Sequence, residues 1–158
     1  MRKLLVLLPT LLLFVTGCAH DFSDKSLALV DRTIAFGALR ENPDAYRGKF
    51  VLLGGSVANV TPVPEGTLLE VAQYRLDSGG MPDHTAGSGG RFLATTPEFL
   101  DTATCKPGAL VSMVGEVTGK KVQPLKGKEY TYPVIAVKEL HFFKTDEDYF
   151  RTWSPYGP

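Results

Sequence analysis

Hydrophobic and polar residues alternate with a period of two along most of the chain from residue 50 onward, and this pattern predicts β-strands. The predicted strands cover Phe50–Thr61, Thr67–Leu76, a short stretch at 91–96, a fourth at 109–119 and a last at 133–143. Sixteen glycines and eleven prolines accompany little helical periodicity, as expected for short strands joined by turns.

The fourth predicted strand shows the alternation clearly. Val111, Met113 and Val117 fall on one face and Ser112 on the other, while Val114 departs from the pattern. This strand is therefore expected to have one apolar and one polar face. In the first predicted strand, a central glycine pair at 54–55 predicts a bulge or sharp coil at which a sheet bends into a barrel.

Helical signals are confined to two short segments. One helix is predicted at 35–41, ended by Pro43, and a helical segment begins at Pro97 and closes near residue 108. Residues 120–132 are expected to form a hairpin arm or a long loop. The pattern predicts a mainly β fold: a small OB-like β-barrel of about five strands, with a short helix between strands three and four. A plain β-sandwich remains the alternative, because strand number does not separate the two.

The beginning of the chain follows a different pattern. Arg2 and Lys3 precede an apolar run of twelve residues at 4–15, interrupted at Pro9 and Thr10. As a helix this run would rise about 18 Å, against a hydrocarbon core of about 30 Å, so a membrane span is disfavoured. A basic start, a short apolar region and small residues are typical of a secretory signal peptide.

The residues that follow, Val15-Thr16-Gly17-Cys18, resemble a bacterial lipobox. Cleavage between Gly17 and Cys18 would leave a thiol that accepts a diacylglyceryl group and a new amine that can be acylated. The alternative is an ordinary signal peptide with an incidental cysteine. Ala19, next to the cysteine, favours the outer membrane in the sorting rule of enterobacterial lipoproteins.

These signals divide the chain into four parts. We expect a cleaved signal peptide at 1–17, a lipidated N-terminus and tether at 18–32, the barrel domain at 33–144 and a polar and aromatic tail at 145–158. The whole chain has 17 basic and 17 acidic residues. Removing the signal peptide takes away two basic residues and no acidic one, leaving 15 against 17, which argues against a nucleic-acid partner.

Five segments in order are similar to the Slp family of outer-membrane lipoproteins: NPDAYRGKFVLLGGSVANV, TLLEVAQYRLDSGGMP, GRFLATTPEFLD, GALVSMVGEVTG and YTYPVIAVKELHFF. The resemblance implies a lipid-anchored domain at the outer membrane, facing the periplasm, and it carries no catalytic residues to transfer. One departure is Trp153, ten residues behind Phe143, since family members often have a tryptophan close behind the last strand.

The glycine-rich loop Asp77–Arg91 is the main candidate for a binding site. Its candidate residues for contacting a ligand or a partner are Asp77, Gly79, Gly80, Asp83, His84 and Arg91. A phosphate cradle is disfavoured, because such loops lead into a helix N-terminus whereas this one leads into a strand. In an OB-like barrel, however, loops of this kind border the face that binds ligands.

Other reactive groups are scattered. His20, His84 and His141 show no metal-ligand spacing, so neither a metal site nor a cofactor is expected. Cys105 has no neighbouring histidine and is expected to be a half-buried loop residue rather than a nucleophile. Aromatic residues are dense towards the C-terminus, where those of the tail suggest contact with a partner or a membrane interface. They are Tyr130, Tyr132, Phe142, Phe143, Tyr149, Phe150, Trp153 and Tyr156.

Three classes of function follow. The leading hypothesis is a non-enzymatic envelope lipoprotein, whose partners are the membrane, through a lipid on Cys18, and an envelope protein. The second is a periplasmic module that binds a small molecule or partner through the barrel face and the glycine-rich loop. An enzyme is the third, disfavoured because the sequence holds neither a G-x-S-x-G motif nor a Cys–His signature.

Overall fold

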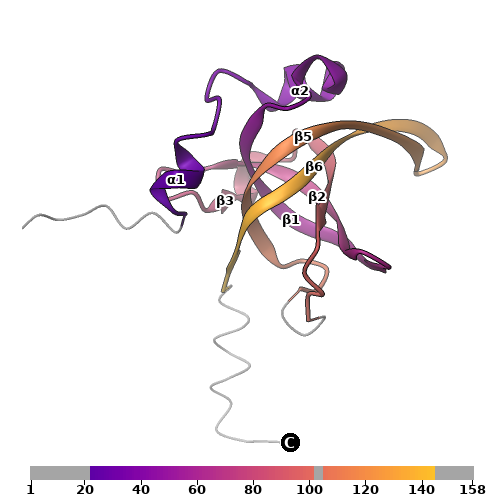
Figure 1. Ribbon diagram of the computed structural model, residues 1–158. Helices are drawn as coiled ribbons and strands as arrows, with labels where there is room; N and C mark the ends of the chain where they lie inside the picture. Colours follow the sequence, from indigo (N-terminus) through magenta and orange to yellow (C-terminus); the bar gives the residue numbers. More distant parts are fainter. Residues whose placement is uncertain (1–21, 102–104, 145–158) are drawn as a thin grey trace, which may run out of the picture.

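The computed structural model describes residues 22–101 and 105–144, so the predicted signal peptide, Cys18 and the tail at 145–158 lie outside the described residues. Within this part, strands predominate, which confirms the predicted mainly β class (Figure 1). The helical elements are α1 (Asp24–Leu27), α2 (Phe36–Glu41), η1 (Pro43–Tyr46) and η2 (His84–Ala86). The strands are β1 (Phe50–Val63), β2 (Gly66–Leu76), β3 (Pro82–Asp83), β4 (Gly90–Thr96), β5 (Leu110–Leu125) and β6 (Lys128–Phe143).

The five long strands close into a ring. The order of the described strands is β1-β5-β6-β4-β2-β3, and β1 also pairs with β2. The pairings are antiparallel except between β4 and β6, which run parallel over a short stretch around Ala94 and Ile135. This single closed sheet replaces the sandwich alternative, which would have required two separate sheets.

The arm beyond the ring is the hairpin expected at 120–132. β5 and β6 remain paired as far as Leu125 and Lys128, and Figure 1 shows the two strands extending together past the rest of the sheet. Lys126 and Gly127 form its turn with φ angles of 52° and 78°. Positive φ at both central residues is characteristic of the tight turns whose twist matches that of antiparallel strands.

The core lies inside the ring and beneath α2, the helix predicted at 35–41. Leu69, Val71, Val111 and Met113 point inward from β2 and β5 and are fully buried, which for β5 confirms the predicted apolar face. The helix contributes Leu39, also fully buried. α2 therefore covers one end of the ring (Figure 1).

The bulge predicted at the glycine pair of β1 lies further along the strand. The register of β1 against β2 shifts between Val57 and Asn59, not at the glycines. A Cβ atom on Gly55 would lie 1.8 Å from the carbonyl oxygen of Ala72, and one on Gly54 would lie 2.6 Å from the Ser112 hydroxyl. The pair thus permits close approach of the strands on both sides of β1.

The helix predicted between strands three and four is absent from the described part of its segment, residues 97–101 and 105–108. Side chains bind the backbone there instead. The Thr67 hydroxyl donates to the Glu98 carbonyl at 2.8 Å and accepts from the Leu100 amide at 3.1 Å. These bonds from β2 occupy backbone groups that helical bonds would otherwise use.

The segment expected to be a tether, 18–32, packs against the sheet from Phe22 onward. The Ser23 amide and hydroxyl donate to the two carboxylate oxygens of Glu139 on β6, at 2.9 and 2.8 Å. Phe22 is 5% exposed and makes an edge contact with His141, with ring centroids 6.4 Å apart. The described end of the N-terminal segment is therefore part of the folded domain.

The polar face of β5 is correspondingly less exposed than its pattern suggests. Ser112, on this face, is fully buried and its hydroxyl donates to the Gly80 carbonyl at 2.5 Å. Val114, the departure from the alternation, is also fully buried. Its neighbours in register are Leu52 and Glu139, and Glu139 is the residue that holds the start of α1. The apolar side chain at 114 therefore suits a face that is covered.

Replacing Glu139 with glutamine is expected to loosen this contact. Hydrogen bonds from the Ser26 and Ser23 hydroxyls and the Ser23 amide hold the pKa of Glu139 below its ordinary value of 4.5. Because the pKa is lowered on folding, the charged carboxylate favours the packed state above pH 4.5, and this contribution is lost as pH falls through the lowered value. Amide hydrogen exchange of residues 24–30 should become several-fold faster in the variant at neutral pH. Glu129→Gln, an exposed position on the same strand, is the control, and equal exchange in the two variants would contradict the expectation.

Candidate functional site

The glycine-rich loop begins as a compact turn around Asp77. One carboxylate oxygen, Oδ1, accepts from the amides of Gly79 at 2.8 Å and Met81 at 2.9 Å. The Asp77 amide in turn donates to the Met81 carbonyl at 2.9 Å, and Gly80 adopts a φ of 87°. The loop amides therefore bind the protein's own carboxylate, so this turn is closed rather than an open cradle for an anion.

The middle of the loop is a second local turn. Asp83 Oδ1 accepts from the hydroxyl and amide of Thr85 at 2.6 and 2.9 Å, and these bonds lower the pKa of Asp83. His84 begins η2 and is exposed. Asp83 and His84 thus form a solvent-facing turn, held to β2 by β3.

Arg91, at the end of the loop, belongs to a different cluster. Its guanidinium pairs with Glu70 at 2.6 Å, and the same carboxylate oxygen accepts from the Tyr132 hydroxyl at 3.1 Å. The Arg91 amide donates to the Tyr130 hydroxyl at 2.8 Å. Burial, followed by the charge of Glu70, raises the pKa of Tyr132. This cluster ties β2, β4 and β6 together, and its charged groups are already paired.

The structure therefore divides the six loop residues predicted for binding. Asp77, Gly79 and Gly80 line a groove beneath the N-terminal segment. Asp83, His84 and Arg91 do not line it.

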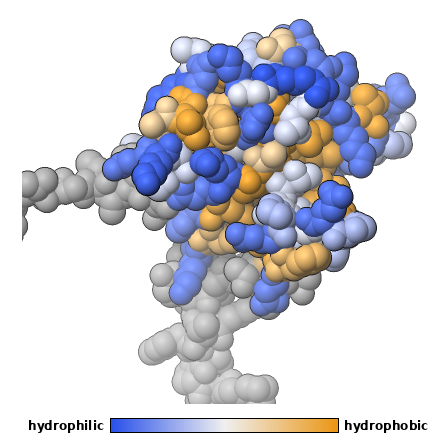
Figure 2. Space-filling model, in the orientation of Figure 1, coloured by the Kyte–Doolittle hydropathy of each residue, from blue (hydrophilic) through white to orange (hydrophobic). Residues whose placement is uncertain are grey.

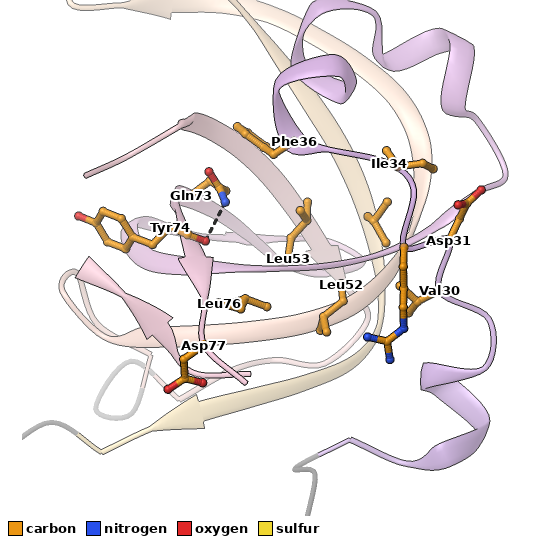
Figure 3. A pocket seen from close by; sticks show the side chains of 12 residues that line it. Val30, Asp31, Ile34, Phe36, Leu52, Leu53, Gln73, Tyr74, Leu76 and Asp77 are labelled. Carbon is orange, nitrogen blue, oxygen red and sulfur yellow. Dashed lines mark hydrogen bonds between the residues drawn. The ribbon is translucent and has the colours of Figure 1, made fainter. Parts of the chain in front are cut away.

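The groove lies where β1 and β2 diverge. Their pairing ends at Gly54 and Tyr74, and the N-terminal segment enters the gap through a bond from the Asp31 amide to the Phe50 carbonyl at 2.9 Å. The resulting hollow has a volume of about 340 Å³. Its lining residues are Val30, Asp31, Arg32, Ile34, Phe36, Val51, Leu52, Leu53, Gln73, Tyr74, Leu76 and Asp77. Figure 3 shows Leu52 and Leu53 of β1 between Leu76 on one side and Val30 and Ile34 on the other.

A second hollow of about 160 Å³ continues from the first towards the start of the described chain. The two share Arg32, Leu52 and Asp77, and the second is also lined by Phe22 and Leu27. Together they form what we call the N-terminal groove. Seven of the twelve residues lining the larger hollow are aliphatic or phenylalanine, so it offers an apolar floor with a few polar groups.

Electrostatics distinguish the charged residues of the N-terminal groove. Asp31 accepts from the Thr33 hydroxyl and amide at 2.6 and 3.1 Å and pairs with Lys49 at 3.7 Å. These partners, the Thr33 hydroxyl foremost, lower the pKa of Asp31. Arg32 is exposed and forms no ion pair or hydrogen bond with any residue that the structure describes. The N–H donors of its guanidinium are therefore available to bind a ligand.

The remaining candidate residues are Cys105 and the histidines. Cys105 lies in a loop, as expected, but it is buried at 1% exposure rather than half-buried, and burial raises the pKa of its thiol. Residues 22–101 and 105–144 contain no cluster of three or more His, Cys, Asp or Glu side chains that could hold a metal ion. His20 lies outside the described residues, whereas His141 sits between the rings of Phe22 and Phe143.

The surface of the domain is mixed in character. Figure 2 shows hydrophobic areas interspersed among hydrophilic ones on the face in view. The large hydrophobic side chains exposed in the described part of the chain are Leu29, Met81, Phe99 and Val122, in four separate segments. No helix among the described residues is both long and apolar enough to cross a bilayer.

Comparison with known proteins identifies relatives. Residues 15–158 match the model of the outer membrane lipoprotein Slp family, a range that begins at the first residue of the predicted lipobox. The chain is 34% identical over 87 residues to outer membrane protein Slp of Escherichia coli K12, covering 55% of this chain and 46% of the relative. It is 35% identical over 95 residues to the uncharacterized lipoprotein YeaY of the same strain, covering 60% and 49%.

The chain therefore spans about half the length of the curated relatives it matches. The family model, by contrast, matches nearly the whole chain, and this confirms the resemblance drawn from the five sequence segments. The chain belongs to the outer membrane lipoprotein Slp family.

Proposed function

We propose that this outer membrane lipoprotein is a non-enzymatic envelope protein, held by lipid on Cys18 with its ring of strands facing the periplasm. Its role is structural support or binding. The observation that carries the proposal is the lipobox Val15–Cys18, which ends only four residues before Phe22, where the folded domain has begun.

The chemistry of the N-terminus supports the proposed anchor. Cleavage before Cys18 leaves a thiol and an amine on one residue, and both can carry acyl chains. Each buried methylene contributes about 0.8 kcal/mol, and a single chain gives only marginal binding, so several chains on one residue give a stable anchor. Such an anchor requires no membrane-spanning helix.

The state of the reactive groups supports a role without catalysis. The thiol of Cys105 is buried, and its raised pKa disfavours the thiolate that a nucleophile requires. Glu70 and Arg91 neutralise each other. Asp77 binds the amides of its own turn.

A second candidate function is a periplasmic binding module. The N-terminal groove favours it, because an apolar floor with one available cation is typical of sites for small molecules. This groove replaces the full glycine-rich loop as the candidate site, with Asp77, Gly79 and Gly80 as the residues in common.

The anchor is tested by substituting each cysteine in turn. Cells expressing the unmodified chain are grown with an alkyne-labelled fatty acid, and incorporation is measured on the purified protein. We expect Cys18→Ser to abolish labelling and release or misprocess the protein. Cys105→Ser, the matched control at the second of the two cysteines, should label normally. An unlabelled parent protein, or a labelled Cys18→Ser variant, would refute the proposed anchor.

A further inference from the structure

The apolar part of the N-terminal groove has room for one hydrocarbon chain. Its apolar lining comes from Val51, Leu52 and Leu53 of β1, Leu76 of β2 and Ile34 of the N-terminal segment. Figure 3 shows Leu52 on the side of β1 that faces Leu76, and Leu53 on the opposite side, towards Phe36 and Ile34. The larger hollow, at about 340 Å³, lies at the lower end of the roughly 300–1,000 Å³ typical of small-molecule pockets. The volume therefore suits a single-chain amphiphile rather than a two-chain phospholipid.

The polar part of the groove favours an anionic head group. Arg32 lines both hollows and has no partner among the described residues, so its guanidinium can bind a carboxylate through two parallel hydrogen bonds. The neighbouring acids already have partners: Asp31 pairs with Lys49, and Asp77 Oδ1 accepts from two loop amides. A cationic head group would be repelled by Arg32.

The position of the groove brings it close to a source of such molecules. Phe22 lines the smaller hollow and is fixed against β6, and Cys18 is four residues earlier. Four residues span at most about 14 Å when fully extended. If Cys18 carries the lipid proposed above, the opening beside Phe22 lies within that distance of the lipidated residue at the bilayer surface.

We propose that the N-terminal groove binds a fatty-acid anion from the membrane surface. The carboxylate pairs with Arg32 and the chain lies along Leu52 and Leu76. This inference rests on the proposed function, because the lipid anchor places the groove near membrane fatty acids. The preference for a fatty-acid anion comes from the residues that line the groove. Each methylene that enters the apolar hollow should strengthen binding about fourfold until the space is filled.

The test uses the lipidated protein in nanodiscs of phosphatidylcholine, with a diazirine analogue of dodecanoate as the probe. After illumination, tryptic peptides are analysed by mass spectrometry. We expect cross-links in residues 30–36, 51–53 and 73–77. Arg32→Gln should reduce them about fivefold, as expected for loss of one exposed ion pair. Arg75→Gln, which removes an exposed cation from β2 outside the groove, should change them less than twofold.

Competition distinguishes the head groups. Unlabelled dodecanoate should displace the probe at lower concentration than dodecyl maltoside, which has the same chain and a neutral head. Cross-links outside the groove, equal yields in the two arginine variants, or equal competition by the neutral amphiphile would each overturn the proposal. The mass of the peptide that begins at Cys18 reports acylation in the same digest, so a failed anchor is distinguished from a groove that binds no fatty acid.

Discussion

Replacing Phe92 with alanine is expected to lower the free energy of unfolding by about 3–5 kcal/mol. Phe92 is fully buried inside the ring of strands, where its side chain meets Phe36 of α2 edge-on at a centroid distance of 6.1 Å. Removing it leaves a cavity between β4 and α2 that the closed sheet cannot fill without breaking strand pairing. The loss would be a large fraction of the roughly 5–15 kcal/mol that stabilises a typical domain. Denaturant unfolding followed by circular dichroism measures it.

Phe99→Ala is the matched control for this substitution. The same side chain is removed, but Phe99 is 73% exposed, so the free energy of unfolding should change by less than about 0.5 kcal/mol. Similar losses in the two variants would show that the core described inside the ring is wrong.

Replacing Gly55 with alanine is expected to destabilise the domain by about 3 kcal/mol, the upper end of the usual cost of overpacking. The added Cβ would lie 1.8 Å from the carbonyl oxygen of Ala72 and 2.7 Å from its carbonyl carbon. These are backbone atoms of the paired strand, which cannot rotate away as a flexible side chain would, so β1 and β2 must separate. The same unfolding measurement applies.

Gly37→Ala is the control, and it should stabilise the domain rather than destabilise it. Gly37 lies in α2 with nothing within 4 Å of an added Cβ. Alanine there should raise the free energy of unfolding by about 0.5–1 kcal/mol, because glycine is a poor helix former. Tolerance of alanine at Gly55 would contradict the strand register at the glycine pair.

The alternation of apolar and polar residues predicted the individual strands correctly. The alternation of Leu69 and Val71 with Glu70 and Ala72 marks β2, and positions 111, 113 and 117 mark the inner face of β5. These strands are half-buried, so one face records the core directly in the sequence. The helix at 36–41 was also recognisable from its terminating Pro43.

Features that depend on distant segments could not be predicted in the same way. The parallel pairing of β4 with β6 joins residues about forty positions apart, such as Leu93 and Val134, and no local signal specifies it. Ser112 has the polarity of a solvent-facing residue but is buried, because the loop at Gly80 covers it and accepts its hydrogen bond. Its satisfied hydroxyl explains how a polar residue is tolerated there.

The candidate site was partly predictable for the same reason. The glycine-rich sequence predicts Asp77, Gly79 and Gly80 as candidate binding residues, and all three line the N-terminal groove. Arg32 also lines it but is not predicted from the sequence, because residues 18–32 have the pattern of a tether. A groove formed by a chain terminus crossing the gap between two strands has no sequence motif of its own; the apolar residues Ile34 and Phe36 were the only available sign.

The short distance between the lipobox and the folded domain also changes the expected picture of the anchor. The predicted tether at 18–32 would have let the domain move far from the membrane. With Phe22 and Ser23 fixed on β6, the free length after Cys18 is about 14 Å at most. Under the proposed function, the ring of strands therefore stays beside the lipid surface rather than ranging through the periplasm.

The most direct test of the central claim is the intact mass of the protein purified from outer membranes. We predict a chain that lacks residues 1–17 and begins at a Cys18 carrying diacylglyceryl and a further acyl group, with nothing added at Cys105. A full-length chain, or one beginning at Cys18 without lipid, would contradict it.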